Sequence, residues 1–136
     1  MNQKSSFSYK NTNPIQQGIF CIVLVTIISI ICLVCRIKSI QSWNMILSPI
    51  FLFCFYNPII GVFKQKMFQY AAISTIVLVI LAFFIYLAGS FVSELSYAKV
   101  EELHKITALV FLFYFLLYTI SIVFRAVLYL LNEVDK

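Results

Sequence analysis

Cys32 and Cys35 are the residues whose type and spacing most directly suggest chemistry. They form the sequence CLVC, and Arg36 follows immediately. A C-x-x-C pair brings two sulfur atoms within one helical turn, and a neighbouring cation favours the reactive thiolate form of a cysteine. The pair could therefore exchange electrons with a dithiol. Because cysteine also packs as a small hydrophobe, the same two residues fit a plain packing role in an apolar helix.

Five polar side chains form a stripe on the last apolar stretch of the chain. At 100° per residue they lie within one narrow face of a helix. They are Thr107, Tyr114, Tyr118, Ser121 and Arg125. Polar groups in lipid turn toward other helices to find hydrogen-bond partners. The stripe therefore predicts an inner face, a partner-binding face or a narrow polar path.

Arg125 raises a separate question, because it is a permanent cation near the end of that stretch. Its long side chain could extend to the lipid headgroups and act as an anchor. A buried contact through the planar guanidinium is the alternative, and lysine could not replace arginine in such a contact. We expect an anchor, with the stripe still facing protein.

The sequence YNPIIG places Asn57 and Pro58 inside an apolar stretch that also contains Pro49. Proline removes a backbone hydrogen bond and bends a helix. A helix from Trp43 to Tyr56 would be about 21 Å long at 1.5 Å per residue, too short to cross a bilayer. We therefore predict a helix that continues through a kink at Pro49, Asn57 and Pro58. Broken helices bind ions or substrates in some transporters, but kinks without ligands are commoner.

Other catalytic patterns are missing from the sequence. His104 is the only histidine, which excludes a haem with two axial histidines from one chain. Glu101 and Glu102 are expected in the first turn of a helix rather than as zinc ligands. No acidic residue lies inside an apolar stretch, which argues against a proton-coupled exporter. We expect no metal site, no cofactor and no enzymatic activity.

The elements that position these residues follow from the distribution of charge. The chain is 62% hydrophobic and 11% charged, and its charges leave four uncharged gaps of 25, 25, 27 and 19 residues. A helix needs roughly 20 apolar residues to cross a membrane. We predict an all-α integral membrane bundle of four transmembrane helices, at about residues 15–35, 43–63, 67–92 and 104–131. The short turns make neighbouring helices antiparallel. Residues 15–131 form one domain, between polar tails at 1–14 and 132–136.

Two stripes of small residues predict helix packing. In the third stretch Thr75, Ala82 and Gly89 repeat every seven residues, and Ala71 and Ser93 lie nearby on the same face. Small side chains at that period allow close helix contact. In the first stretch, one side holds Gly18, Cys21, Cys32 and Cys35. We also expect Trp43 at the membrane–water interface, where tryptophan is enriched.

A chain with four membrane spans and the sequence CLVC at the end of its first span resembles the quinone-linked membrane oxidoreductases that generate disulfides. The resemblance implies that Cys32 and Cys35 pass electrons from a soluble partner to a quinone. That family carries a second cysteine pair between its third and fourth helices. Residues 93–105 contain no cysteine here, and Cys21 and Cys54 lie within apolar stretches. The oxidoreductase is therefore kept as an alternative function.

The basic residues predict orientation and partners. Six Lys and Arg residues lie on the side of the termini and four lie on the other side, in the turns that contain Arg36 and Lys99. The excess favours cytosolic termini, in a membrane that we expect to be a bacterial cytoplasmic membrane. The net charge of +5 sits at the ends of the spans, where it meets lipid phosphates rather than nucleic acid.

Our leading hypothesis is a small non-enzymatic membrane protein that acts through helix–helix contacts. Its partners would be the lipid bilayer and either other membrane protein subunits or itself. It could be an accessory subunit of a membrane complex, an immunity-type protector or a homo-oligomer. The two alternatives are the oxidoreductase, the only case that needs a quinone, and a small channel or carrier lined by the stripe of residues 107–125.

Overall fold

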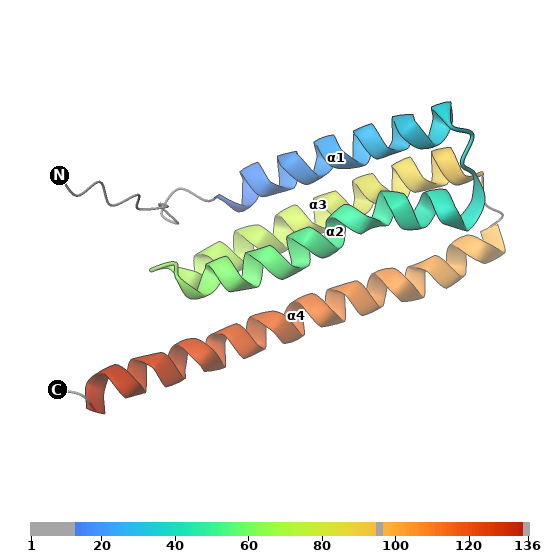
Figure 1. Cartoon of the computed structure of the whole chain (residues 1–136). Helices are drawn as coiled ribbons and strands as arrows, with labels where there is room; N and C mark the ends of the chain where they lie inside the picture. The colour runs from blue at the N-terminus through green and yellow to red at the C-terminus, as the bar shows by residue number, and fades with distance from the viewer. Residues whose placement is uncertain (1–12, 95–96, 135–136) are drawn as a thin grey trace, which may run out of the picture.

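Four long helices make up the protein, and the computed structural model describes residues 13–94 and 97–134. They are α1 (Pro14–Val34), α2 (Ser39–Val62), α3 (Met67–Ser93) and α4 (Tyr97–Val134). Consecutive helices run in opposite directions (Figure 1). Each contains a segment long and apolar enough to cross a membrane. The predicted all-α bundle of four antiparallel transmembrane helices is confirmed.

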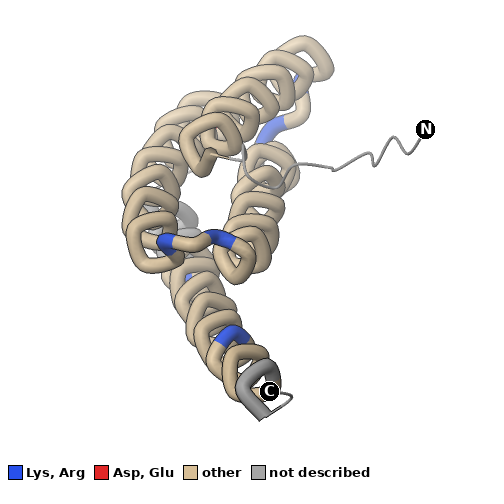
Figure 2. The backbone as a smooth tube through the Cα atoms, turned by 90° about the vertical axis from the view of Figure 1, so that its left-hand side faces the viewer, with Lys and Arg blue, Asp and Glu red and all other residues tan. Residues whose placement is uncertain are grey.

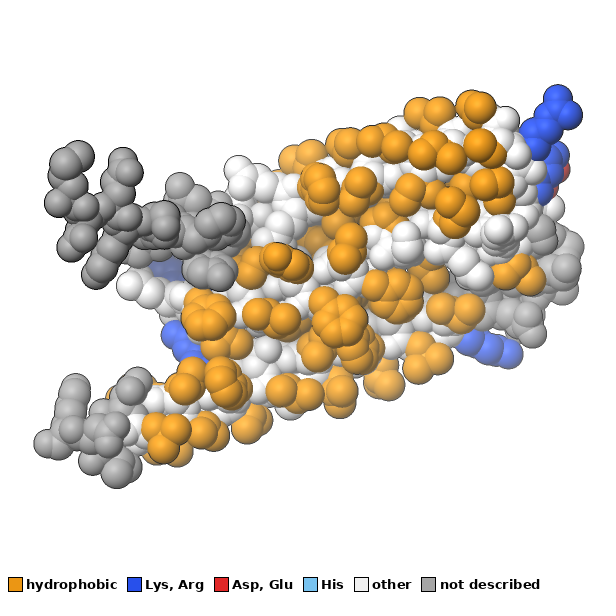
Figure 3. All heavy atoms as spheres, in the orientation of Figure 1, with side chains coloured by type: hydrophobic (Ala, Val, Ile, Leu, Met, Phe, Trp, Pro, Cys, Tyr) orange, Lys and Arg blue, Asp and Glu red, His pale blue; other side chains and the backbone are white. Residues whose placement is uncertain are grey.

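The outer surface of the bundle is apolar, as expected for helices in contact with lipid. Large side chains such as Val34, Phe68 and Phe91 are more than three-quarters exposed. Hydrophobic side chains cover the middle of the molecule, and Lys and Arg side chains lie toward its two ends (Figure 3). This surface identifies the chain as a multi-pass integral membrane protein.

The first helix has recognisable start and stop signals. The side chain of Asn13 accepts a hydrogen bond from the backbone N–H of Ile15 at 3.1 Å, and Pro14 occupies the first turn. Both are favoured at helix N-termini. At the other end Arg36 takes a left-handed conformation with φ 54°, and the N–H of Ile37 bonds the carbonyl of Cys32 at 2.8 Å. This Schellman motif ends α1 without a glycine and leads directly into α2.

Two helix boundaries differ from those expected. Ser39 begins α2, where Trp43 was expected, and α4 runs from Tyr97 to Val134 instead of residues 104–131. The polar segment before the fourth span is rich in good helix formers, so the helix extends into it. With 38 residues, α4 is about 57 Å long, well beyond the roughly 30 Å hydrocarbon core. Residues 1–12 of the expected N-terminal tail and 135–136 of the C-terminal tail lie outside the described residues.

The four helices do not contribute equally to the bundle. α1, α2 and α3 all pack against one another, whereas α4 packs along α2 and touches α3 only sparsely. The view along the bundle shows α4 to one side of the other three helices (Figure 2). One side of α3 therefore faces a groove beside α4 instead of a packed helix.

The bundle has two ends, which we call the terminal side and the opposite side. The terminal side holds Asn13, the α2–α3 turn and the last turns of α4, and the opposite side holds the α1–α2 turn and the end of α3 (Figure 1). Between them the core is apolar and closely packed. Its fully buried side chains include Val25, Ile46, Ile50, Leu78 and Leu81.

Trp43 lies inside the bundle, near the start of α2, and does not face the lipid. The residue is 2% exposed, and its ring packs edge-on against Tyr86 with 6.0 Å between the ring centroids. A Cβ atom on Gly89 would lie 2.5 Å from the indole ring. The absence of a side chain at Gly89 therefore gives Trp43 its place between α2 and α3.

Candidate functional site: a buried polar cluster

Neutral polar side chains from all four helices gather on the terminal side of the bundle. We call this set the polar cluster. It consists of Gln17 from α1, Asn57 from α2, Tyr70, Ser74 and Thr75 from α3, and Tyr114 and Tyr118 from α4. In lipid an unpaired polar group is costly, so a set of this kind either fixes helix packing or binds a polar ligand.

Asn57 is the centre of the cluster and is fully buried. Its Oδ1 atom accepts hydrogen bonds from the hydroxyl of Tyr70 at 3.1 Å and from the hydroxyl of Ser74 at 2.9 Å. Its Nδ2 atom donates to the carbonyl of Phe53, one turn earlier, at 3.2 Å. One amide side chain thus joins α2 to two successive turns of α3.

The helix that carries Asn57 continues through both of its prolines, as the length argument predicted. Pro49 cannot donate a backbone hydrogen bond to the carbonyl of Met45. The hydroxyl of Ser48 donates to that carbonyl at 2.7 Å instead. This local replacement stabilises an otherwise broken turn. Both Pro49 and Pro58 are fully buried, beside the helices that pack on α2.

Tyr114 and Tyr118 extend the cluster onto α4. The hydroxyls of Tyr114 and Thr75 are 3.5 Å apart, and the two tyrosine rings pack edge-to-face with 4.9 Å between their centroids. Gly61 makes room for Tyr118, because a Cβ there would lie 3.3 Å from the ring. The stripe on α4 therefore faces α2 and α3, and its Ser121 is also buried.

Two polar atoms in this region are buried without a hydrogen-bond partner among the described residues. They are the Oε1 atom of Gln17 and the hydroxyl of Tyr118. Each could bond a water molecule or the polar group of a neutral ligand. The cluster contains no carboxylate, amine or imidazole, so its chemistry is hydrogen bonding.

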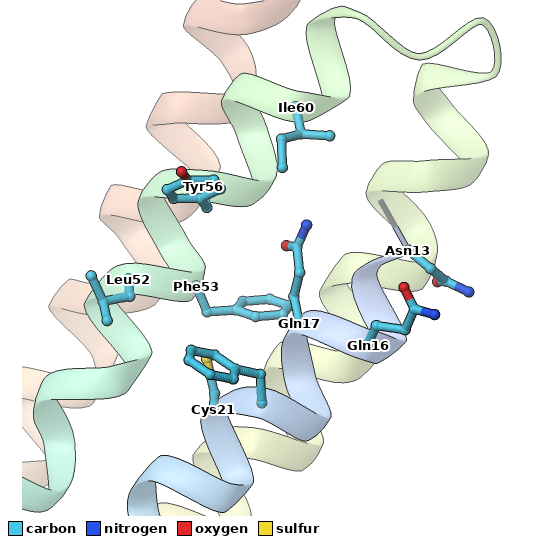
Figure 4. A pocket seen from close by; sticks show the side chains of 9 residues that line it. Asn13, Gln16, Gln17, Cys21, Leu52, Phe53, Tyr56 and Ile60 are labelled. Atoms are coloured by element: carbon cyan, nitrogen blue, oxygen red, sulfur yellow. The ribbon is translucent and has the colours of Figure 1, made fainter. Parts of the chain in front are cut away.

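A groove between α1 and α2 opens beside Gln17. It has a volume of about 470 Å³ and is lined by residues of both helices. The side chain of Gln17 extends toward Ile60, next to the ring of Phe53, while Gln16 and Asn13 lie farther out (Figure 4). Apart from these amides and Tyr56, the lining is apolar.

Arg125 finds its partners within the same chain. Its guanidinium donates to the backbone carbonyls of Lys64 at 2.6 Å and Gln65 at 3.3 Å, in the turn between α2 and α3. The side chain is partly buried. These partners are backbone carbonyls of the α2–α3 turn, a set of acceptors that the sequence alone did not indicate. The two hydrogen bonds satisfy backbone acceptors of a turn that lies outside the helices.

The small-residue stripe on α3 faces α2 and the groove beside α4. Gly89 and Ser93 are buried, whereas Ala71, Thr75 and Ala82 are half-buried. A hollow of about 190 Å³ lies on the same face toward the opposite side of the bundle. Its lining includes Ala82, Trp43 and Thr107, the first residue of the stripe on α4.

Cys32 and Cys35 are both free thiols but face different surroundings. Cys32 is fully buried in the core and Cys35 is exposed. The end of α1 lies between them, so Cys32 packs in the core and Cys35 lies at the surface. On α1, Gly18 and Cys21 are buried as well, and Gly18 lies against Val77 of α3.

The expected position of the two glutamates is wrong. Glu101 and Glu102 lie beyond the first turn of α4, because the helix begins at Tyr97. Their side chains and that of His104 lie outside the described residues. Among the described side chains, no group of three His, Cys, Asp or Glu residues could hold a metal ion.

Gln17, Tyr70 and Ser74 are cluster residues that sequence reasoning missed. A signal for two of them was present: Tyr70 and Ser74 are four residues apart, so they share one helix face. Asn57 in an apolar helix required such partners.

The chain matches no protein-family model, no curated protein and no solved structure.

Proposed function

We propose that the protein is a non-enzymatic membrane subunit that acts by helix–helix contact with another membrane protein. The observation that carries the proposal is the placement of α4, which packs on α2 and leaves α3 largely uncovered on that side. The residues facing this groove include small ones on α3, such as Ala82, which remain half-buried. Small residues in lipid favour close approach of a further helix.

The contact face lies toward the opposite side of the bundle, at the hollow beside Ala82. The hollow is bordered by Trp43, Tyr86 and Thr107 from three different helices. Its volume of about 190 Å³ can receive a side chain from a partner helix. Packing of that kind is the main source of affinity between transmembrane helices, because lipid tails are as apolar as the helices.

Co-purification after mild detergent extraction tests the proposal, with Ala82→Leu as the variant. Leucine at residue 82 fills the hollow, and we expect the yield of the co-purifying protein to fall about tenfold or more, since overpacking costs roughly 1–3 kcal/mol. Ala72→Leu is the matched control, because Ala72 is exposed on the same helix. Equal yields for Ala82→Leu, Ala72→Leu and the unchanged chain would contradict the proposal.

The mass of the captured complex distinguishes the kinds of partner. A different membrane protein supports the accessory subunit, and a toxin-like partner whose action is blocked supports the immunity-type protector. A multiple of the mass of this chain supports the homo-oligomer. A chain that purifies alone and runs as a monomer in several mild detergents would count against all three.

The two alternatives fit the geometry less well. A polar path would have to cross the apolar half of the core, where Ile46, Ile50 and Leu81 are fully buried. An oxidoreductase would have to use Cys32, which is enclosed by the core. A reversible disulfide between Cys32 and Cys35 in membranes with an oxidised quinone pool would revive that alternative.

We also propose that the terminal side faces the cytosol of a bacterial cell. The support is the excess of Lys and Arg on that side, including Lys64 and Lys66 in the turn. In a Cys35→Ser background, a membrane-impermeant thiol reagent should label Glu94→Cys from outside and should not reach Gln65→Cys. The reverse labelling pattern would show that the termini are outside.

A further inference from the structure

A cleft separates the first turn of α3 from the last turns of α4 on the terminal side. Its volume is about 670 Å³, and it lies where α4 diverges from the rest of the bundle. In Figure 3, Lys and Arg side chains lie in the hollow between the end of α4 and the other helices. The lining of the cleft combines polar and cationic side chains with apolar ones.

The cations of the cleft are Lys66 and Arg125. Lys66 is exposed, and Arg125 is held in place by its bonds to the carbonyls of Lys64 and Gln65. A guanidinium has five N–H donors, so these two bonds leave donors for a further acceptor. The ammonium group of Lys64 lies 5.6 Å from the ring centre of Tyr70 at the same turn, which adds a third positive charge nearby.

No described acidic side chain offsets this charge. Glu94 is the one acidic residue whose side chain falls within the described part of the chain, and it bonds Lys38 at 2.8 Å on the opposite side of the bundle. The described side chains that line the cleft therefore carry positive charge only, which suits an anion. Arginine prefers phosphate and carboxylate because their oxygens match its planar donors.

The membrane depth of the cleft and its apolar walls favour an anionic lipid over a soluble anion. It lies at the ends of two membrane spans, since the span of α3 starts at Met67 and that of α4 ends at Leu131. This is the depth at which lipid phosphates meet hydrocarbon. Phe68 and Leu130 line the cleft and are largely exposed. They suit an acyl chain and would be poor surroundings for a free, hydrated anion.

We propose that this cleft binds one anionic phospholipid, with its phosphate at Lys66 and Arg125 and an acyl chain along Phe68 and Leu130. The lipid would occupy the space between α3 and α4 that the protein leaves open on this side. The site does not depend on the partner proposed above, whose contact face is the hollow beside Ala82.

Native mass spectrometry of the full chain tests the proposal. The chain is released from micelles that contain equal amounts of phosphatidylglycerol and phosphatidylcholine with identical acyl chains. We expect preferential retention of one phosphatidylglycerol molecule. Lys66→Gln should reduce that retention about fivefold, the effect of roughly 1 kcal/mol for one cation near lipid phosphates. Lys66 is exposed, so this variant should fold normally.

Lys105→Gln is the matched control, because Lys105 is an exposed cation at the other end of α4. It should leave lipid retention unchanged. Equal losses in Lys66→Gln and Lys105→Gln would indicate diffuse attraction and overturn the proposal. Equal retention of the two lipids would do the same. Displacement of the lipid by millimolar inorganic phosphate would assign the site to a soluble anion and overturn the lipid assignment.

Discussion

The two sides of the bundle are held together by different kinds of contact. On the terminal side, Asn57 and its partners join the helices by hydrogen bonds between neutral side chains. On the opposite side, the indole ring of Trp43 fills the space that Gly89 leaves on α3. The first kind of contact fixes which groups must meet, whereas the second depends on the fit of shapes.

This difference explains the position of α4. Without a hydrophobic driving force between helices in lipid, packing and hydrogen bonds decide which helices associate. On the terminal side α4 offers Tyr114 and Arg125, which reach α3 and the α2–α3 turn. Toward the opposite side a hollow remains near Thr107. Hydrogen bonds therefore hold α4 to α3 and to the turn on the terminal side, beside the open cleft, whereas the hollow lies toward the opposite side.

The largest effect is expected for Asn57→Ala, which removes the centre of the polar cluster. Three hydrogen bonds disappear, and the hydroxyls of Tyr70 and Ser74 lose their acceptor. We expect a loss of about 2–3 kcal/mol, since one side-chain bond within a membrane contributes about 0.6–1.7 kcal/mol. The measurement is equilibrium unfolding in detergent.

Asn44→Ala is the matched control for this variant, because Asn44 is exposed on the same helix. It should change the free energy of unfolding by less than about 0.5 kcal/mol. Similar stabilities for Asn57→Ala and Asn44→Ala would mean that the polar cluster does not hold the bundle together.

Gly89→Ala tests the packing of the opposite side by adding a methyl group next to the ring of Trp43. The new methyl group would lie 2.5 Å from the indole ring of Trp43, so the ring or the helix must move. We expect a loss of about 1–3 kcal/mol, even though alanine favours the helix over glycine. Trp43→Leu in the same chain should recover part of this loss. If Gly89→Ala alone is as stable as the unchanged protein, the ring of Trp43 does not pack closely against residue 89.

Arg125→Lys measures how far the guanidinium fastens α4 to the turn. An ammonium group cannot bond the carbonyls of Lys64 and Gln65 with the same planar geometry. We expect a loss of about 1 kcal/mol, the contribution of a typical hydrogen bond. Arg36→Lys, at an exposed arginine on the opposite side, should be neutral. If both lysine variants match the unchanged protein in thermal unfolding, Arg125 serves as a simple anchor.

Tyr118→Phe should have the smallest effect, because the hydroxyl has no hydrogen-bond partner among the described residues. We expect a change below about 0.5 kcal/mol in either direction, as removing an unpaired buried group releases its desolvation cost. Tyr70→Phe is the comparison, since it loses a bond to Asn57 at 3.1 Å. A loss for Tyr118→Phe equal to that for Tyr70→Phe would indicate that a water or ligand bonds Tyr118.

Part of the polar cluster could be predicted from the sequence. Its residues Tyr114 and Tyr118 share one helix face with Ser121, and the structure places all three in the interior. Their partners could not be assigned, because the periodicity of one helix carries no information about the residue opposite. The role of Gln17 was also hidden, since it lies among other polar residues at the start of α1.

The sequence by itself determined the number, length and order of the membrane spans. Uncharged gaps longer than a bilayer leave a chain few other structures, because lipid cannot satisfy exposed backbone groups. Only the tertiary structure decided which faces are buried. In a soluble protein the apolar face of a helix marks the core, but here apolar residues cover every face and lipid accepts them all. Trp43 therefore lies inside the bundle while Phe68 and Phe91 face outward, and Arg125 meets a turn that is distant in sequence.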